Sequence, residues 1–202
     1  MTIRTLVKTG LAAGTALALS ACAMDGMAGM NADAGMNGVS ASSTVEVGGA
    51  AMYPTRTIVE NAVNSPIHTT LVAAVKAAGL VDTLNSPGPF TVFAPTNAAF
   101  DKLPAGTVDM LLMPQNKAML TKVLTYHVVP GRVSSAQLMQ MIRDGGGMAR
   151  LTTVEGGTLT ARMQGNAVVL VDEMGGVSTV TQVDVMQSNG VIHVTDTVSM
   201  PN

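Results

Sequence analysis

The sequence contains no tryptophan, a single cysteine, and only two Tyr and three Phe residues. One cysteine cannot form a disulfide within the chain, so a disulfide-stapled scaffold is excluded. Charged residues make up 12% of the 202 residues, and the formal net charge of −2 excludes the basic footprint of a nucleic-acid-binding protein. Since aromatic residues are so few, the hydrophobic core must be built mainly from Val, Leu, Ile, Ala and Met.

Motifs for catalysis and for metal binding are also missing from the sequence. The three histidines, His68, His127 and His193, do not stand in H-x-H or HExxH spacing. No G-x-S-x-G elbow, phosphate-binding P-loop or dinucleotide-binding glycine pattern occurs. Asp172 and Glu173 lie beside two glycines after an apolar run, so they are predicted to form a solvated turn. The sequence therefore predicts a protein that is not an enzyme and carries no cofactor.

The N-terminal residues have the features of a secretion signal. Arg4 and Lys8 precede a short apolar run at residues 11–19, which is too short for a membrane-spanning helix of about 20 residues. The run ends in Leu-Ser-Ala-Cys, which resembles the lipobox of bacterial lipoproteins. Residues 1–21 are therefore predicted to be a signal peptide, and Cys22 an acylated residue that anchors the chain to a membrane, plausibly the outer one. The alternative is an ordinary signal peptide followed by a cysteine.

Residues 22–52 are rich in Gly, Ala, Ser, Asn and Met and show no periodicity, so a flexible linker is expected. A flexible chain of this length reaches on the order of 30 Å. Met24, Met27 and Met30 recur every three residues, and clustered thioethers are soft ligands that favour Cu(I). The alternative is a general habit of composition, because the whole chain has 16 Met.

Residues 53–202 are predicted to form one domain. Its first half shows short helical patterns, and its second half is mainly β-branched runs separated by Gly- and Asn-containing turns. Helices followed by strands indicate an α+β fold with a single core. No internal repeat is present, so one copy of the domain is expected.

Residues 91–100 (TVFAPTNAAF) predict a turn from strand to helix. Phe93 belongs to a short alternating strand, and Pro95 is expected to end it because proline has no N–H for strand pairing. Thr96 is placed to cap a helix, with its hydroxyl accepting from a first-turn N–H. Phe100 then returns an aromatic side chain to the core.

Three segments together resemble the fasciclin domain, a secreted or surface-anchored module usually linked to adhesion. They are residues 91–100, residues 126–133 (YHVVPGRV) and residues 188–201 (SNGVIHVTDTVSMP), in the family's order. The resemblance covers almost all of residues 57–201. It implies a wedge of two β-sheets packed against several short helices.

The resemblance also implies roles for individual polar residues. The segment that contains Tyr126 and His127 contributes to partner recognition in animal relatives; the alternative is a structural histidine that locks a strand to a loop. From the sequence, Tyr126 and His127 are expected to lie in a strand and to point to opposite faces. His193 is expected to be structural. Asn97 and Asp196 are expected to hydrogen-bond local backbone beside turns.

These observations predict a non-enzymatic, lipid-anchored protein of the cell envelope. Its domain is expected to be a monomer that mediates adhesion or protein–protein contact, with a protein partner at the envelope or in the matrix. Two alternatives stay open. One is binding of Cu(I) by the Met-rich linker, or of a small molecule in an apolar pocket between sheet and helices. The other is a structural envelope protein with no specific ligand.

Overall fold

The computed structural model describes residues 44–202. Cys22 and the methionines Met24, Met27 and Met30 lie outside the described residues. Within residues 44–202, no helix is both long and apolar enough to cross a membrane.

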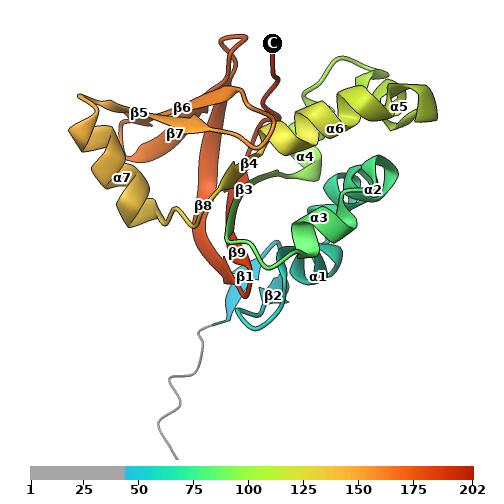
Figure 1. Ribbon diagram of the computed structural model, residues 1–202, viewed down its shortest axis with the longest axis horizontal. Helices are drawn as coiled ribbons and strands as arrows, with labels where there is room; N and C mark the ends of the chain where they lie inside the picture. The colour runs from blue at the N-terminus through green and yellow to red at the C-terminus, as the bar shows by residue number, and fades with distance from the viewer. Residues whose placement is uncertain (1–43) are drawn as a thin grey trace, which may run out of the picture. The chain divides into compact units, whose positions relative to one another are not determined.

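Short helices alternate with strands in the first half of the domain, and strands dominate the second half (Figure 1). The helices are α1 (Ile58–Val63), α2 (Thr69–Ala78), α3 (Val81–Asn85), α4 (Asn97–Asp101), α5 (Thr107–Leu112), the 3₁₀ turn η1 (Pro114–Asn116), α6 (Lys117–Tyr126) and α7 (Ser135–Asp144). The strands are β1 (Val45–Val47), β2 (Ala50–Met52), β3 (Phe90–Pro95), β4 (Val128–Pro130), β5 (Met148–Thr152), β6 (Thr158–Gln164), β7 (Ala167–Val171), β8 (Val177–Gln187) and β9 (Gly190–Thr195). The α+β class is confirmed.

The strands form a two-stranded sheet, β1-β2, and a seven-stranded sheet in the order β4-β3-β9-β8-β7-β6-β5. The three segments that resemble the fasciclin domain meet in the larger sheet, because β3 pairs with β9 in parallel and with β4 antiparallel. Just after β5, which is the last strand in this order, the N–H of Val154 donates to the carbonyl of Val128 in β4 at 2.7 Å. The two ends of the sheet are thus brought together, and the sheet is nearly closed.

Side-chain alternation along the central strands divides the interior into two cores. Val92 and Ala94 of β3 belong to the helical core, which also contains buried residues of α1–α6. Phe93 belongs to the strand core, together with Leu138 of α7 and buried residues of β5–β7. Figure 1 shows the same division, with α1–α6 on one side of β3 and α7 beside β5, β6 and β7. Because successive side chains of a strand point to opposite faces, β3 serves both cores.

A short β-hairpin lies within the segment that the sequence predicts to be a flexible linker. Tyr53 was the expected first residue of the domain, but β1 and β2 already form a hairpin before it. Val47 and Met52 of this hairpin are only 2% and 3% exposed. The Gly48-Gly49 turn has positive φ at both residues, as hairpin turns of this kind require. Strands of three residues are too short to produce a periodic pattern in the sequence.

The β-like run before Pro130 is mostly helical in the structure. Helix α6 continues to Tyr126, His127 ends it, and β4 begins only at Val128. The prediction that Tyr126 and His127 lie in a strand is therefore wrong. Leu120, Val123 and Leu124 are all buried, so packing of this helical face overrides the local preference of the β-branched residues.

Candidate functional site

Phe93 and His193 are cross-strand partners on β3 and β9, and both are fully buried. Their rings stack with centroids 5.6 Å apart and an interplanar angle of 27°. His193 Nε2 lies 2.9 Å from the carbonyl oxygen of Val133, and its Nδ1 accepts the N–H of Asp184 at 3.3 Å. A carbonyl can only accept, so Nε2 carries the proton. Burial lowers the pKa of His193, with the Val133 carbonyl and the Asp184 charge opposing the shift.

The turn after β3 joins the sheet to the helices. Pro95 is the last residue of the strand, and the hydroxyl of Thr96 accepts the N–H of Ala99 at 3.3 Å to cap α4. Phe100 follows on α4 and is buried in the helical core. The sequence was sufficient to predict this cap because the capping residue and its partner are only three residues apart.

Asn97 caps a helix other than its own. Its Oδ1 accepts the N–H of Thr70 at 3.0 Å, and its Nδ2 donates to the carbonyl of Pro66 and to the hydroxyl of Thr69. The residue before α2, His68, makes no side-chain cap. The side chain of Asn97 thus provides a partner for a free N–H at the start of α2, 27 residues earlier in the sequence. The sequence had predicted a local partner instead.

Asn189, in the turn between β8 and β9, plays a similar part that the sequence did not reveal. Its Oδ1 accepts the N–H of Ile58 at 3.0 Å, at the start of α1. Its Nδ2 donates to the carbonyls of Leu84 and Ser86 at 2.7 and 3.1 Å, at the end of α3. In the sequence, Ser-Asn-Gly indicates a hairpin turn and nothing more. Asn97 and Asn189, hereafter the asparagine clamps, attach three helices to two of the signature segments.

Asp196 is held by a backbone N–H of β8, by the hydroxyl of the next residue and by one cation. Its Oδ1 accepts the N–H of Thr179 at 2.7 Å and the hydroxyl of Thr197 at 3.0 Å, and its Oδ2 lies 3.3 Å from Lys102 Nζ. Burial by itself would raise the pKa of Asp196. The hydrogen bonds from Thr179, Thr197 and Lys102, with the Lys102 charge, outweigh it and lower that pKa. Asp196 therefore fixes the end of β9 against β8.

Tyr126 is fully buried at the end of α6, in the strand core. Its hydroxyl donates to the carbonyl of Thr158 at 2.8 Å and accepts the N–H of Glu173 at 3.2 Å. Burial, with smaller contributions from nearby carboxylates, raises the pKa of Tyr126 to about 12. This phenol stays protonated at physiological pH and connects α6 to the start of β6 and to the β7–β8 connection.

His127 is 3% exposed and connects α6 to the C-terminal segment. Its Nδ1 lies 2.8 Å from the carbonyl oxygen of Val123, and its Nε2 accepts the N–H of Ser199 at 3.0 Å. The proton therefore sits on Nδ1, the opposite tautomer from His193. Burial lowers the pKa of His127, against the Val123 carbonyl and the Asp172 charge. The ring is neutral, and both of its nitrogens have partners.

Asp172 supports the same junction and is buried, contrary to the solvated turn that the sequence indicated. Its Oδ1 accepts the N–H groups of Met174 and Gly176 at 3.1 and 2.6 Å. Its Oδ2 accepts the N–H of Met200 at 2.9 Å. A carboxylate that accepts three backbone N–H groups organises the chain around it, and here it joins the β7–β8 turn to the C-terminus.

Tyr126 and His127 are thus brought together by the fold, but their side chains lie inside the domain. Neither ring is exposed enough to contact a partner directly.

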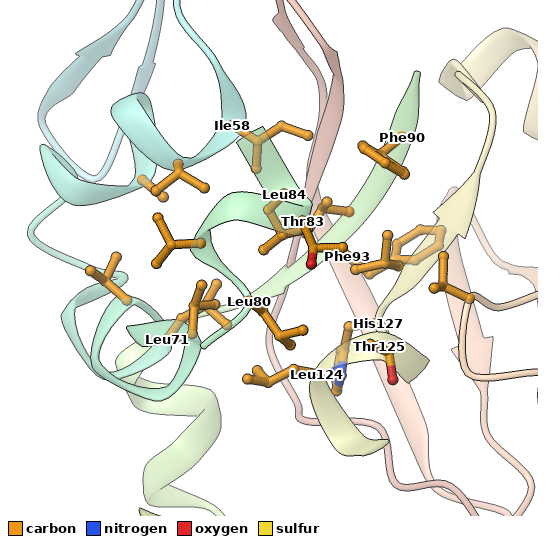
Figure 2. Close-up of a pocket in the computed structure, with 18 of the residues that line it drawn as sticks. Ile58, Leu71, Leu80, Thr83, Leu84, Phe90, Phe93, Leu124, Thr125 and His127 are labelled. Atoms are coloured by element: carbon orange, nitrogen blue, oxygen red, sulfur yellow. The ribbon is translucent and has the colours of Figure 1, made fainter. Parts of the chain in front are cut away.

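An apolar groove lies between helices α1–α3 and the elements β3, β4 and α6 (Figure 2). Ile58, Leu71 and Leu84 form one wall, and Phe90 and Leu124 lie on the other. About 770 Å³ between the walls is not filled by atoms, part of it open to solvent, but the groove is narrow, with a cavity volume of about 60 Å³. Its lining is almost wholly apolar, as in many small-molecule sites.

A second, smaller cavity of about 20 Å³ adjoins the groove, since Ile58, Ala62, Leu71 and Val92 line both. His68 lines this inner cavity. Its Nδ1 is 2.8 Å from the hydroxyl of Ser65, whereas Nε2 is buried without a hydrogen-bond partner among residues 44–202. Burial lowers the pKa of His68, and the Ala94 carbonyl offsets part of this shift.

A shallow hollow of about 560 Å³ lies where α7 meets β5. Met141 and Met148 line it and are 38% and 53% exposed. Asp144 and Arg150 line the same hollow, so it contains one negative and one positive side chain beside the two methionines. We call these four residues the methionine hollow.

The part of the chain that the structure describes holds no group of three or more His, Cys, Asp or Glu side chains suited to a metal ion. Its polar interior groups instead connect segments of the fold. The geometry thus defines a class of protein: an α+β module with structural buried histidines, an apolar groove and an exposed methionine hollow.

Residues 66–201 match the fasciclin domain family, which is about two thirds of the chain. The chain belongs to this family. Two relatives and one solved structure illustrate its range. Protein sll1483 of Synechocystis is 48% identical over 145 residues, which cover 72% of this chain and 73% of the relative.

The cell surface glycolipoprotein MPB83 of Mycobacterium bovis is 39% identical over 166 residues, covering 77% of this chain and 64% of the relative. A solved fasciclin domain pair, from the insect cell adhesion molecule Fasciclin I, superposes with a TM-score of 0.63 at 20% identity. It covers 71% of this chain, which spans half of that protein. This likeness shows the fold alone.

Proposed function

We propose that the protein is a lipid-anchored envelope module whose domain binds a protein partner and so mediates adhesion. Family membership supports this role, and so does the relative that is named a cell surface glycolipoprotein. The solved insect neighbour is named a cell adhesion molecule. Cys22 would carry the acyl anchor, and residues 23–43 would act as a spacer.

The methionine hollow is the observation that carries the proposed protein contact. Flexible, polarizable methionine side chains suit surfaces that bind other proteins. Met141 and Met148 line this exposed hollow together with Asp144 and Arg150, so the surface combines apolar and charged side chains. Protein interfaces have this composition. α7 positions Met141, because its capping box at Ser134 and Gln137 fixes the start of that helix.

The test is a deletion strain complemented with variants of the full chain, with attachment and cell aggregation measured. The double substitution Met141→Glu and Met148→Glu is expected to leave the protein at the envelope but to abolish attachment. Met110→Glu with Met113→Glu is the matched control, since these methionines are equally exposed but belong to the other side of the domain. Full attachment by the first variant would show that the methionine hollow is not the contact surface. Normal attachment of the deletion strain would contradict a role in adhesion.

Cys22→Ala tests the anchor separately. The variant is expected to leave the membrane fraction and to lose incorporation of labelled palmitate. A variant that stays in the membrane fraction would contradict lipid anchoring through this cysteine.

A further inference from the structure

We propose that the apolar groove binds a free fatty acid, with the acyl chain between the helices and β3 and the carboxylate at Lys76. The groove and the methionine hollow are built from different elements, so this binding and the proposed protein contact can fail independently.

The walls determine that the ligand is apolar and slender. Nearly all of the groove's exposed surface belongs to apolar atoms, among them those of Leu80, Leu84 and Val92. Each methylene group that such a surface buries contributes about 0.8 kcal/mol. The cavity volume of about 60 Å³ leaves no room for a bulky ring system without rearrangement. A single hydrocarbon chain fits this shape.

Lys76 determines the other end of the ligand. It is the only charged residue among those that line the groove, and it lies exposed on α2. Among residues 44–202, no carboxylate comes within 4.0 Å of its ammonium group, whereas Lys102 and Lys122 each have a carboxylate partner. One unpaired cation beside an otherwise apolar groove is complementary to a molecule with one anionic group and one apolar chain.

The inner end of the groove limits the length of the chain. Ala62 and Val92 stand between the groove and the inner cavity. Beyond them, the inner cavity of about 20 Å³ is only about the size of one water molecule, so it leaves no room for further methylene groups. The acyl chain is therefore expected to stop at Ala62.

The experiment uses the purified full-length chain and cis-parinaric acid, a fluorescent fatty acid, as the direct probe. The chain contains no tryptophan, so protein emission does not interfere. Decanoate, dodecanoate and dodecanol then compete for the probe. We expect saturable binding, about three- to fourfold stronger competition per added methylene until the groove is filled, and a preference for dodecanoate over dodecanol.

Two variants and two matched controls locate the site. Lys76→Gln is expected to weaken dodecanoate two- to fivefold, as for an exposed ion pair, and to leave dodecanol unchanged. Ala62→Phe is expected to weaken both competitors at least tenfold. Lys117→Gln and Ala73→Phe, at exposed positions that do not line the groove, are expected to bind like the parent chain. Circular dichroism verifies that each variant is folded.

Three outcomes would overturn the proposal. One is the absence of saturable probe binding. Another is unchanged dodecanoate affinity in a folded Ala62→Phe variant, which would place the fatty acid elsewhere on the chain. A third is sedimentation showing a dimer that Ala62→Phe converts to monomers, which would identify the groove as an interface between two copies.

Discussion

The helical core and the strand core lie on opposite sides of the same strands, yet they are closed by different means. The strand core is enclosed by a nearly closed sheet and by α7, and it holds the fully buried rings of Phe93 and Tyr126. The helical core is enclosed by short helices of five to ten residues. Both apolar cavities lie on the helical side.

The difference arises from how each kind of element satisfies its backbone. Paired strands satisfy one another along their length, so a closed sheet needs few side chains for this purpose. Every short helix instead leaves N–H and C=O groups unsatisfied at both ends. The asparagine clamps supply partners for α1, α2 and α3 at fixed points, and between these points the apolar groove remains. The nearly closed sheet encloses the strand core, and the groove lies among the clamped helices.

The largest expected effect comes from emptying the strand core. Phe93→Ala is expected to lower the free energy of unfolding by about 3–5 kcal/mol, because it leaves a cavity and removes the ring stacked on His193. Phe90→Ala is the comparison on the same strand: both rings line the groove, but Phe90 is half-buried whereas Phe93 is fully buried in the strand core. It is expected to cost less than half as much in urea unfolding. Equal losses would contradict the distinction between a filled core and one that contains a groove.

Acidification should weaken both cores. Burial holds the pKa values of His68, His127 and His193 below their ordinary value of 6.5. Below pH 6.5 the unfolded chain therefore binds protons that the folded chain does not. Stability is greatest above pH 6.5 and falls as the pH drops toward the lowered pKa of each histidine, by at most about 1 kcal/mol per histidine between pH 6.5 and 5.5, or at most about 3 kcal/mol in all.

Urea unfolding at pH 7.5, 6.5 and 5.5 measures this loss. His127→Asn keeps a donor near the Val123 carbonyl and removes one titrating group, so about a third of the pH dependence should disappear. A variant with the parent's full pH dependence would show that His127 is not among the groups responsible.

Asn189→Ala is expected to destabilise the helical core and to leave the strand core unchanged. It removes three hydrogen bonds to the ends of α1 and α3, and an expected loss of about 2–3 kcal/mol follows from the groups left unpaired. Amide hydrogen exchange should accelerate in α1 and α3 and stay unchanged in β5–β7. Asn166→Ala, in the exposed turn between β6 and β7, is the control and should change neither. Uniform acceleration across the domain would mean that the helices and the sheet open together.

The smallest expected effect is at the junction of α6 with β6 and the β7–β8 connection. Tyr126→Phe keeps the buried ring and removes only the hydroxyl, which bonds Thr158 and Glu173. A loss of about 1–2 kcal/mol in the free energy of unfolding is expected. Attachment of cells should be retained, because the side chain is not at the surface. Lost attachment with unchanged stability would assign Tyr126 a direct part in recognition.

The sequence by itself determined the features whose partners lie close along the chain. Thr96 caps its helix through a backbone N–H three residues later, and residues 91–100, 126–133 and 188–201 were sufficient to identify the family. The limit is visible at α6, where β-branched residues favoured a strand and packing of the buried face kept the helix.

Only the tertiary structure decided the contacts between distant residues. The parallel pairing of β3 with β9 joins positions about 100 residues apart, and Asn189 bonds Ile58 across 131 residues. Asn97, Asn189 and Asp172 each stand beside a turn, where a short polar side chain has an ordinary local use. A local pattern specifies what a side chain can bond, whereas the folded chain specifies which unsatisfied group comes within reach of it. The asparagine clamps and the groove between them therefore exist only once the sheet has brought its distant strands together.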